Sequence, residues 1–136
     1  MNKKTMQDVG ALLVRVILGL VFINHGLDKF QALEGTAGFF SSLGIPGWMA
    51  NVVASIELFG GILVLIGFGT RIVPLLFAWI MIVVMVVMPT DKGFFTGNEL
   101  HISLLAMSLY LVLAGSPLLA VDKLMPIGQK KAEKAY

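Results

Sequence analysis

Four long apolar stretches dominate this 136-residue chain and limit what it can fold into. The first contains a single arginine and the second a single glutamate, while the third and fourth contain no charged residue. A helix needs ~20 mostly apolar residues to cross the hydrocarbon core of a bilayer, and each stretch is about that long. The stretches are residues 9–27, 47–69, 72–89 and 102–121.

Other fold classes fit this pattern poorly. A soluble helix bundle would show a polar stripe at helical spacing on each segment, and none of the four does. The apolar runs do not alternate with a period of two, as half-buried strands would. Only 13% of the residues are charged, whereas soluble domains carry about a quarter. We therefore predict an all-α fold, a membrane four-helix bundle with antiparallel neighbours.

A cleaved signal peptide is the competing interpretation of the first stretch, because Lys3 and Lys4 precede it. Arg15 lies inside the apolar run, however, and no small-x-small cleavage site follows it. We expect a first helix that is retained.

The connections between the stretches also predict structure. Residues 28–46 hold Phe and Leu among Gly, Ser and Thr, which predicts a short helix at the membrane interface between the first and second helices. The link 68–71 is very short, so the second and third helices should be antiparallel neighbours. Pro117 is expected to bend or end the fourth helix.

The basic residues of the termini and loops are distributed unevenly between the two sides. One side carries seven and the other carries two, so the positive-inside rule places both termini in the cytoplasm. These residues lie at the chain ends and not in one patch, which argues against a nucleic-acid partner. The seven are Lys3, Lys4, Arg71, Lys123, Lys130, Lys131 and Lys134, and the two are Lys29 and Lys92.

Charged side chains at membrane depth are costly, which makes Arg15 and Glu57 candidates for function. At 1.5 Å per residue, Arg15 lies roughly 9 Å into the first helix and Glu57 roughly 15 Å into the second. On ~30 Å spans of opposite direction their depths differ by roughly 5 Å, so we predict an ion pair between them. We predict that this pair is the centre of the working site, with Arg15 and Glu57 as catalytic residues; a purely structural contact is the alternative.

Histidines at two helix ends form a second candidate group. His25 closes the first helix and His101 opens the fourth, so both should lie near the outer face with Lys29 and Glu99. We predict that these four residues bind a cofactor in a pocket at that end. Two histidines on different helices could ligate a haem or, with carboxylates, a metal ion. Their spacing is not diagnostic, so we expect no metal and disfavour a haem.

Glycines mark the helix faces that should pack together. Gly19 and Gly26 share a face with Arg15, and Gly60 and Gly61 lie close to the face of the intramembrane glutamate. Small residues allow close approach of helices in lipid, so these faces should point into the bundle.

Three segments carry a family resemblance: LLVRVILGLVFINHGLDKF, then LGIP, then IELFGGILVLIGFGTR. In these segments the chain resembles the DoxX family of small four-helix bacterial membrane proteins, over roughly residues 10–122. The resemblance identifies residues 1–136 as one DoxX-like transmembrane domain. Its helices are expected at about 9–27, 47–69, 72–89 and 99–116, followed by a cytoplasmic tail at 122–136. The matching positions are Arg15, Gly19, Phe22, Gly26, Lys29, Glu57, Gly60, Gly61, Gly67 and Arg71.

The resemblance implies a membrane-embedded candidate oxidoreductase, or a subunit of a quinone-linked redox complex. Such proteins are associated with detoxification or catabolism of catechol-type aromatic compounds, with quinones and with oxidative stress. A quinone would suit an apolar bundle with a few polar groups for its carbonyl oxygens. The chain has no Cys and no flavin motif, so electrons would pass through a bound quinone, a cofactor at the histidines or a partner redox protein. The alternative is a non-catalytic membrane protein that acts as an assembly factor or small carrier for a partner.

Overall fold

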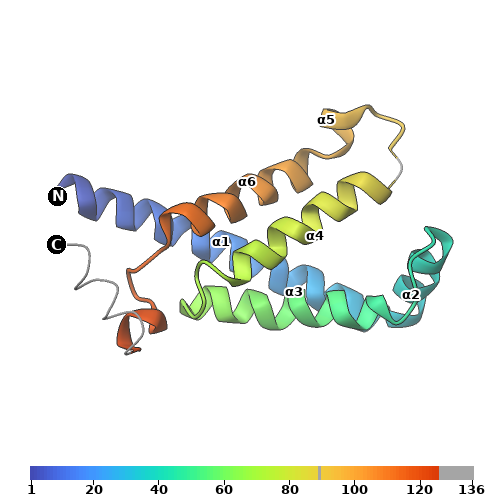
Figure 1. Cartoon of the computed structure of the whole chain (residues 1–136), viewed down its shortest axis with the longest axis horizontal. Helices are drawn as coiled ribbons and strands as arrows, with labels where there is room; N and C mark the ends of the chain where they lie inside the picture. The colour runs from blue at the N-terminus through green and yellow to red at the C-terminus, as the bar shows by residue number, and fades with distance from the viewer. Residues whose placement is uncertain (89, 126–136) are drawn as a thin grey trace.

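The computed structural model describes residues 1–88 and 90–125, and this part of the chain is all-helical, without strands (Figure 1). Two long helices, two medium ones and three short segments follow one another along the chain. They are α1 (Lys3–Gln31), α2 (Leu33–Ser42), α3 (Met49–Ile66), α4 (Val73–Val87), α5 (Phe94–Gly97), α6 (Glu99–Ala114) and the 3-10 helix η1 (Val121–Leu124).

Local sequence explains where several of these helices begin and end. The side chain of Asn2 caps α1 by accepting a hydrogen bond from the backbone N–H of Thr5 at 2.8 Å. Gly67 ends α3 in the left-handed conformation, with φ 82°, and the N–H of Phe68 then bonds back to the carbonyl of Leu63. Pro74 lies in the first turn of α4, where its missing N–H is harmless.

The longer helices associate in pairs. α1 packs along α3, and α4 packs along α6, while the contacts between α3 and α4 are fewer. Figure 1 shows α3 and α4 close together near the link that joins them and separating away from it, toward the end where α2 lies.

Glycines permit the close packing of α1 on α3, as predicted. A Cβ on Gly19 would lie 3.0 Å from the carbonyl oxygen of Gly61, and one on Gly61 would lie 2.8 Å from the backbone nitrogen of Ile23. The two backbones are thus in direct contact at these points. Arg15 and Glu57 are both buried, which confirms that their helix faces point inward.

Aromatic stacking fills the centre of the molecule. The rings of Phe22 and Phe77 are parallel within 7°, with centroids 3.8 Å apart, and both side chains are fully buried. Gly60 leaves room for this stack, because a Cβ there would lie 2.9 Å from Phe77 Cε1. The pair joins α1 to α4 across α3.

The outer surface of the helices carries many large apolar side chains, while the charged residues Arg15 and Glu57 lie inside. Leu13, Phe59, Trp79 and Leu113 are each more than half exposed, whereas Arg15 is almost fully buried. By length and composition, α1 and α3 could each cross a membrane, and α4 and α6 are shorter apolar helices. Such an arrangement, polar within and apolar without, suits a solvent of lipid.

The helix bounds differ from the predicted ones mainly at α1. That helix begins six residues before 9 and continues past 27 to Gln31, so it includes Lys29. The short helix predicted within 28–46 is present as α2, and its location at an interface stays a prediction. α6 ends at Ala114, before Pro117, and the part of the predicted tail from 126 onward lies outside the described residues.

Candidate functional site

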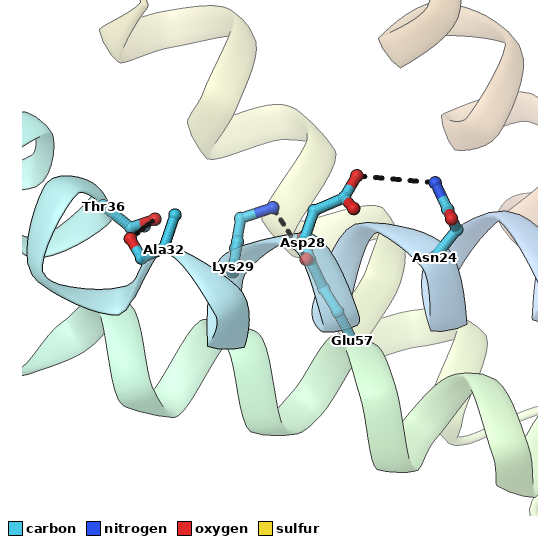
Figure 2. Close-up of polar contacts among 6 residues, drawn as sticks. All are labelled: Asn24, Asp28, Lys29, Ala32, Thr36 and Glu57. Carbon is cyan, nitrogen blue, oxygen red and sulfur yellow. Dashed lines mark hydrogen bonds and ion pairs between the residues drawn. The ribbon is translucent and has the colours of Figure 1, made fainter.

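An ion pair with a buried carboxylate joins α1 to α3. Lys29 Nζ lies 2.8 Å from Glu57 Oε2, and Figure 2 shows the lysine side chain reaching the carboxylate from α1. The Glu57 side chain is 2% exposed and that of Lys29 is 25% exposed. Burying a carboxylate is costly unless a cation and hydrogen bonds offset the lost hydration. Lys29 supplies both to Glu57.

Gly26 explains why the pair can form. A Cβ on Gly26 would lie 2.5 Å from the backbone nitrogen of Leu58, so a glycine is needed for α1 to approach α3 this closely. Residues three apart lie on the same face of a helix. Lys29 is therefore carried over the turn of α3 that holds Glu57.

A cavity of about 600 Å³ lies beside the ion pair, and we call it the main cavity. Its wall is mostly apolar, with α2, α3 and α4 each contributing side chains such as Phe40, Ile56 and Trp79. Its volume falls within the ~300–1,000 Å³ typical of small-molecule sites, which combine an apolar wall with a few polar groups. The polar residues of the lining are His25, Lys29, Thr36, Glu57 and His101.

His101 is held in a defined orientation by Asn98. Asn98 is buried, and its Nδ2 donates to the carbonyl oxygen of Phe94 at 2.8 Å, so Oδ1 is the atom that faces His101. His101 Nδ1 lies 3.2 Å from that oxygen. Since Oδ1 only accepts hydrogen bonds, Nδ1 carries the proton, and the other ring nitrogen of the neutral imidazole is an acceptor. Asn98 was not recognised from the sequence, although an Asn at the start of a helix is a familiar N-cap signal.

Three of the four residues predicted to bind a cofactor line the main cavity: His25, Lys29 and His101. Glu99 is exposed and does not belong to the lining. The reason is helical geometry, because residues two apart on a helix point to nearly opposite sides. Within residues 1–88 and 90–125, no three His, Cys, Asp or Glu side chains gather as a metal site would require.

The predicted ion pair between Arg15 and Glu57 is wrong. The helix contacts place Gly26, not Arg15, level with the turn of α3 that holds Glu57. The sequence separation of Arg15 from Gly26 corresponds to about 16 Å along the helix axis, too far for a side chain to bridge. The depth calculation failed because it aligned both helices by the predicted ends of their apolar runs, whereas α1 extends beyond its run at both ends.

Arg15 instead binds the backbone that follows α6. Its Nη1 donates to the carbonyl oxygens of Ser116 at 2.9 Å and Leu118 at 3.0 Å, and its Nη2 donates to that of Leu119 at 3.1 Å. Leu119 has a positive φ of 51°, an unfavourable conformation that the contact with Arg15 helps to hold. Arg15 does not line the main cavity, so its catalytic role stays a prediction without a contact to support it.

Asp122 completes this arrangement on the link between α3 and α4. Its carboxylate accepts hydrogen bonds from the backbone N–H of Gly69 at 2.8 Å and of Thr70 at 2.9 Å, and from the Thr70 hydroxyl at 3.1 Å. The N–H of Asp122 in turn donates to the carbonyl of Gly67 at 3.0 Å. Segment 115–122 thus ties α1, the α3–α4 link and the end of α6 together at the end opposite the main cavity.

One known protein is similar to this chain over nearly its whole length, and others are similar over about half of it. CatD of Bacillus subtilis, which is named as a candidate oxidoreductase, is 45% identical over 130 residues, or 96% of each chain. The inner membrane protein YqjF of Escherichia coli is 37% identical over 68 residues, 50% of this chain and 52% of its own. The inner membrane protein YphA of Escherichia coli is 34% identical over 85 residues, 57% of this chain and 61% of its own. No solved structure matches the chain.

A family model also matches the chain. The DoxX model matches residues 10–90, which is more than half of the chain and includes Lys29, Glu57 and most of the main cavity. This chain therefore belongs to the DoxX family.

Proposed function

We propose that this protein is a multi-pass membrane protein in which α1, α3, α4 and α6 cross the bilayer as an antiparallel four-helix bundle. The apolar outer surface and the buried charges support this, as do relatives named as inner membrane proteins. In this arrangement both termini face the cytoplasm, and α2 lies at the outer interface over the main cavity.

Within this bundle, the main cavity binds a quinone or a related aromatic compound, and the protein acts as a membrane oxidoreductase or as the membrane subunit of one. The observation that carries the proposal is an apolar cavity whose few polar groups are the Lys29–Glu57 ion pair and the two imidazoles of His25 and His101. The relative named as a candidate oxidoreductase aligns over nearly the whole chain. Catechols and their quinones are the aromatic substrates that we favour.

The groups of the cavity match the two oxygens of such a ring. Lys29 has three N–H groups, of which one bonds to Glu57, so the others can donate to a ligand oxygen. His101 offers its acceptor nitrogen to a hydroxyl group, which a reduced ring has and an oxidised ring lacks. The flat face of the ring would lie against the aromatic and branched side chains of α2 and α4, among them Phe40 and Trp79.

Reduction of a quinone to a hydroquinone takes up two electrons and two protons. We assign the electrons to a partner redox protein and the protons to side chains of this cavity. Glu57 then has a functional role, because it holds the lysine in place and keeps a charge next to the reacting oxygens. Arg15 holds the backbone that follows α6 in place and has no direct contact with the ligand.

Trp79 provides a direct test, because it lines the main cavity and the chain has only one other tryptophan, Trp48. A quinone bound next to an indole quenches its fluorescence. In the Trp48→Phe protein, purified in lipid nanodiscs, we expect saturable quenching by a soluble benzoquinone or naphthoquinone. Trp48 and Trp79 are about equally exposed, at 65% and 66%, and only Trp79 lines the main cavity. The Trp79→Phe protein is therefore a control matched for exposure and should show only unsaturable collisional quenching. Equal quenching curves for both proteins would exclude a quinone site here and favour a carrier or assembly factor.

A further inference from the structure

A second, smaller cavity adjoins the main one and differs from it in character. Its volume is about 310 Å³, it is open to the surface, and its lining consists of His25, Asp28, Lys29 and Thr36. We call it the vestibule. Three of its residues, His25, Lys29 and Thr36, also line the main cavity. A polar space and an apolar one thus share a wall made of titratable and hydroxyl groups.

The vestibule suits water and not an aromatic ring. Asp28 is exposed, and its carboxylate has a single long contact, at 3.5 Å from Asn24 Nδ2, so it keeps most of its capacity to bind water. Figure 2 shows the side chains of Asp28 and Lys29 on the same side of α1. The main cavity, by contrast, has a wall of Ile, Val, Met and aromatic side chains that water does not wet readily.

Lys29 is the group that connects the two spaces. Its side chain is one-quarter exposed and lines both the vestibule and the main cavity, whereas its partner Glu57 is closed off from the surface. An ammonium group can lose a proton and take one up again, which a guanidinium does not do. The position of Lys29 is therefore that of a relay and not only of a structural cation.

We propose that the vestibule is a water-filled proton access route from the outer side, through which Lys29 passes protons between water and a ligand in the main cavity. This proposal rests on the proposed quinone function and on the proposed orientation. In the transfer, an N–H bond of Lys29 breaks as an O–H bond forms on the oxygen of the ring that the partner's electrons have reduced. A vestibule water then protonates the amine, and the resulting hydroxide leaves through the vestibule; the cycle occurs once for each of the two protons. Glu57 stays hydrogen-bonded to Lys29 throughout and keeps the lysine side chain in its position.

Water access can be tested by cysteine labelling, which needs no ligand. The chain has no cysteine, so each introduced cysteine is the only thiol that can react. Single cysteines are introduced as Asp28→Cys and Thr36→Cys and treated with a charged, membrane-impermeant methanethiosulfonate, added to intact cells or to inverted vesicles. We expect labelling from the outer side only. The controls are Val84→Cys, in the apolar wall of the main cavity, and Leu13→Cys, on the outer surface of α1. Both should resist the charged reagent in the native protein and react with a maleimide after denaturation in dodecyl sulfate. Absence of labelling at Asp28→Cys and Thr36→Cys, or labelling from the inner side, would overturn the proposal.

The relay itself is tested by chemical reduction of the bound quinone. Dithionite supplies both electrons and is oxidised to sulfite, while the two protons come from water. We expect reduction in the Lys29→Arg protein to be about 100-fold slower than with lysine, because a positioned acid contributes about that much and arginine keeps its proton. Arginine retains the positive charge beside Glu57, so Trp79 quenching should show that quinone still binds. An unchanged reduction rate in Lys29→Arg would overturn the relay. If the parent protein does not bind quinone, the proposed function is wrong. In that case the labelling result alone decides whether the vestibule holds water.

Discussion

Lys29 and Glu57 should depend on each other for stability, because each is the only ionic partner of the other among residues 1–88 and 90–125. A double-mutant cycle with Lys29→Met and Glu57→Gln should give a coupling energy of about 1–3 kcal/mol in the free energy of unfolding. The measurement is unfolding in mixed micelles of mild detergent and dodecyl sulfate. The parallel cycle with Arg15→Met and Glu57→Gln should give coupling within about 0.5 kcal/mol of zero, since the two residues share no contact. The reverse result would restore the ion pair that the sequence predicted.

Glu57→Gln should also weaken ligand binding. The amide keeps the shape of the side chain but loses the charge that orients Lys29, so we expect the Kd for a soluble naphthoquinone to rise about tenfold, equivalent to about 1.4 kcal/mol. Trp79 quenching gives the Kd. Glu99→Gln is the matched control, because Glu99 is exposed and lies outside the cavity lining. A normal Kd in a folded Glu57→Gln protein would remove Glu57 from the site.

Arg15 should matter for folding and not for binding. Arg15→Met removes hydrogen bonds to three carbonyl groups, so we expect a loss of about 2–4 kcal/mol in the free energy of unfolding. The folded fraction should bind quinone with the parent Kd. Arg71→Met serves for comparison: Arg71 is exposed and its contact with Ala114 is longer, at 3.4 Å, so its loss should cost under about 1 kcal/mol. A raised quinone Kd in Arg15→Met would assign Arg15 to the site after all.

The same residues show what could be predicted from sequence alone. The cost of a charge in lipid identified Arg15 and Glu57 as buried, and both are. Their partners could not be read in this way, because partner choice depends on the register of one helix against another. That register is determined by backbone contacts at Gly26 and Gly19, which composition and depth do not reveal.

At the scale of single elements, the contact between α1 and α3 depends on Gly26. Gly26→Ala places a Cβ 2.5 Å from the backbone nitrogen of Leu58, so the helices must move apart. We expect a loss of about 1–3 kcal/mol in the free energy of unfolding, as for an overpacked core, and a raised quinone Kd because Lys29 shifts from Glu57. Gly10→Ala is the control in the same helix. No atom lies within 4 Å of its new Cβ, so it should gain about 0.5–1 kcal/mol from helix propensity.

Helix positions were more predictable than helix ends. Apolar runs marked the locations of α1, α3, α4 and α6, and the Gly, Ser and aromatic residues between the first two marked α2. The extension of α1 to Gln31 was missed, because Asp28 and Lys29 look like the end of a membrane segment in sequence. Lys29 is nevertheless part of the helix, since Glu57 provides a partner for its charge.

At the scale of the whole molecule, the proposed topology has a direct test. Reporter fusions after Gly69 and after Lys134 should indicate the cytoplasm, and fusions near Gly35 and Gly93 should indicate the outside. The reason is the excess of lysine and arginine on the first side. Paired alkaline phosphatase and green fluorescent protein fusions give opposite readings at each point, so each site has an internal control. A cytoplasmic reading at Gly35 would contradict either the orientation or the number of crossings.

The divergence of α3 and α4 from their short link has a mechanical consequence. A rotation of α4 relative to α3 would have this link as its pivot, and the main cavity lies near the opposite ends of the two helices. α4 is roughly 22 Å long at 1.5 Å per residue, so a rotation of roughly 5° at the pivot displaces its far end by about 2 Å. That distance is comparable to the difference in width between aromatic rings with and without an added methyl group. Asp122 holds this link by its contacts with Gly69 and Thr70. Under the proposed function we therefore expect Asp122→Asn to change which ring sizes the main cavity accepts, although Asp122 lies at the opposite end of the helices.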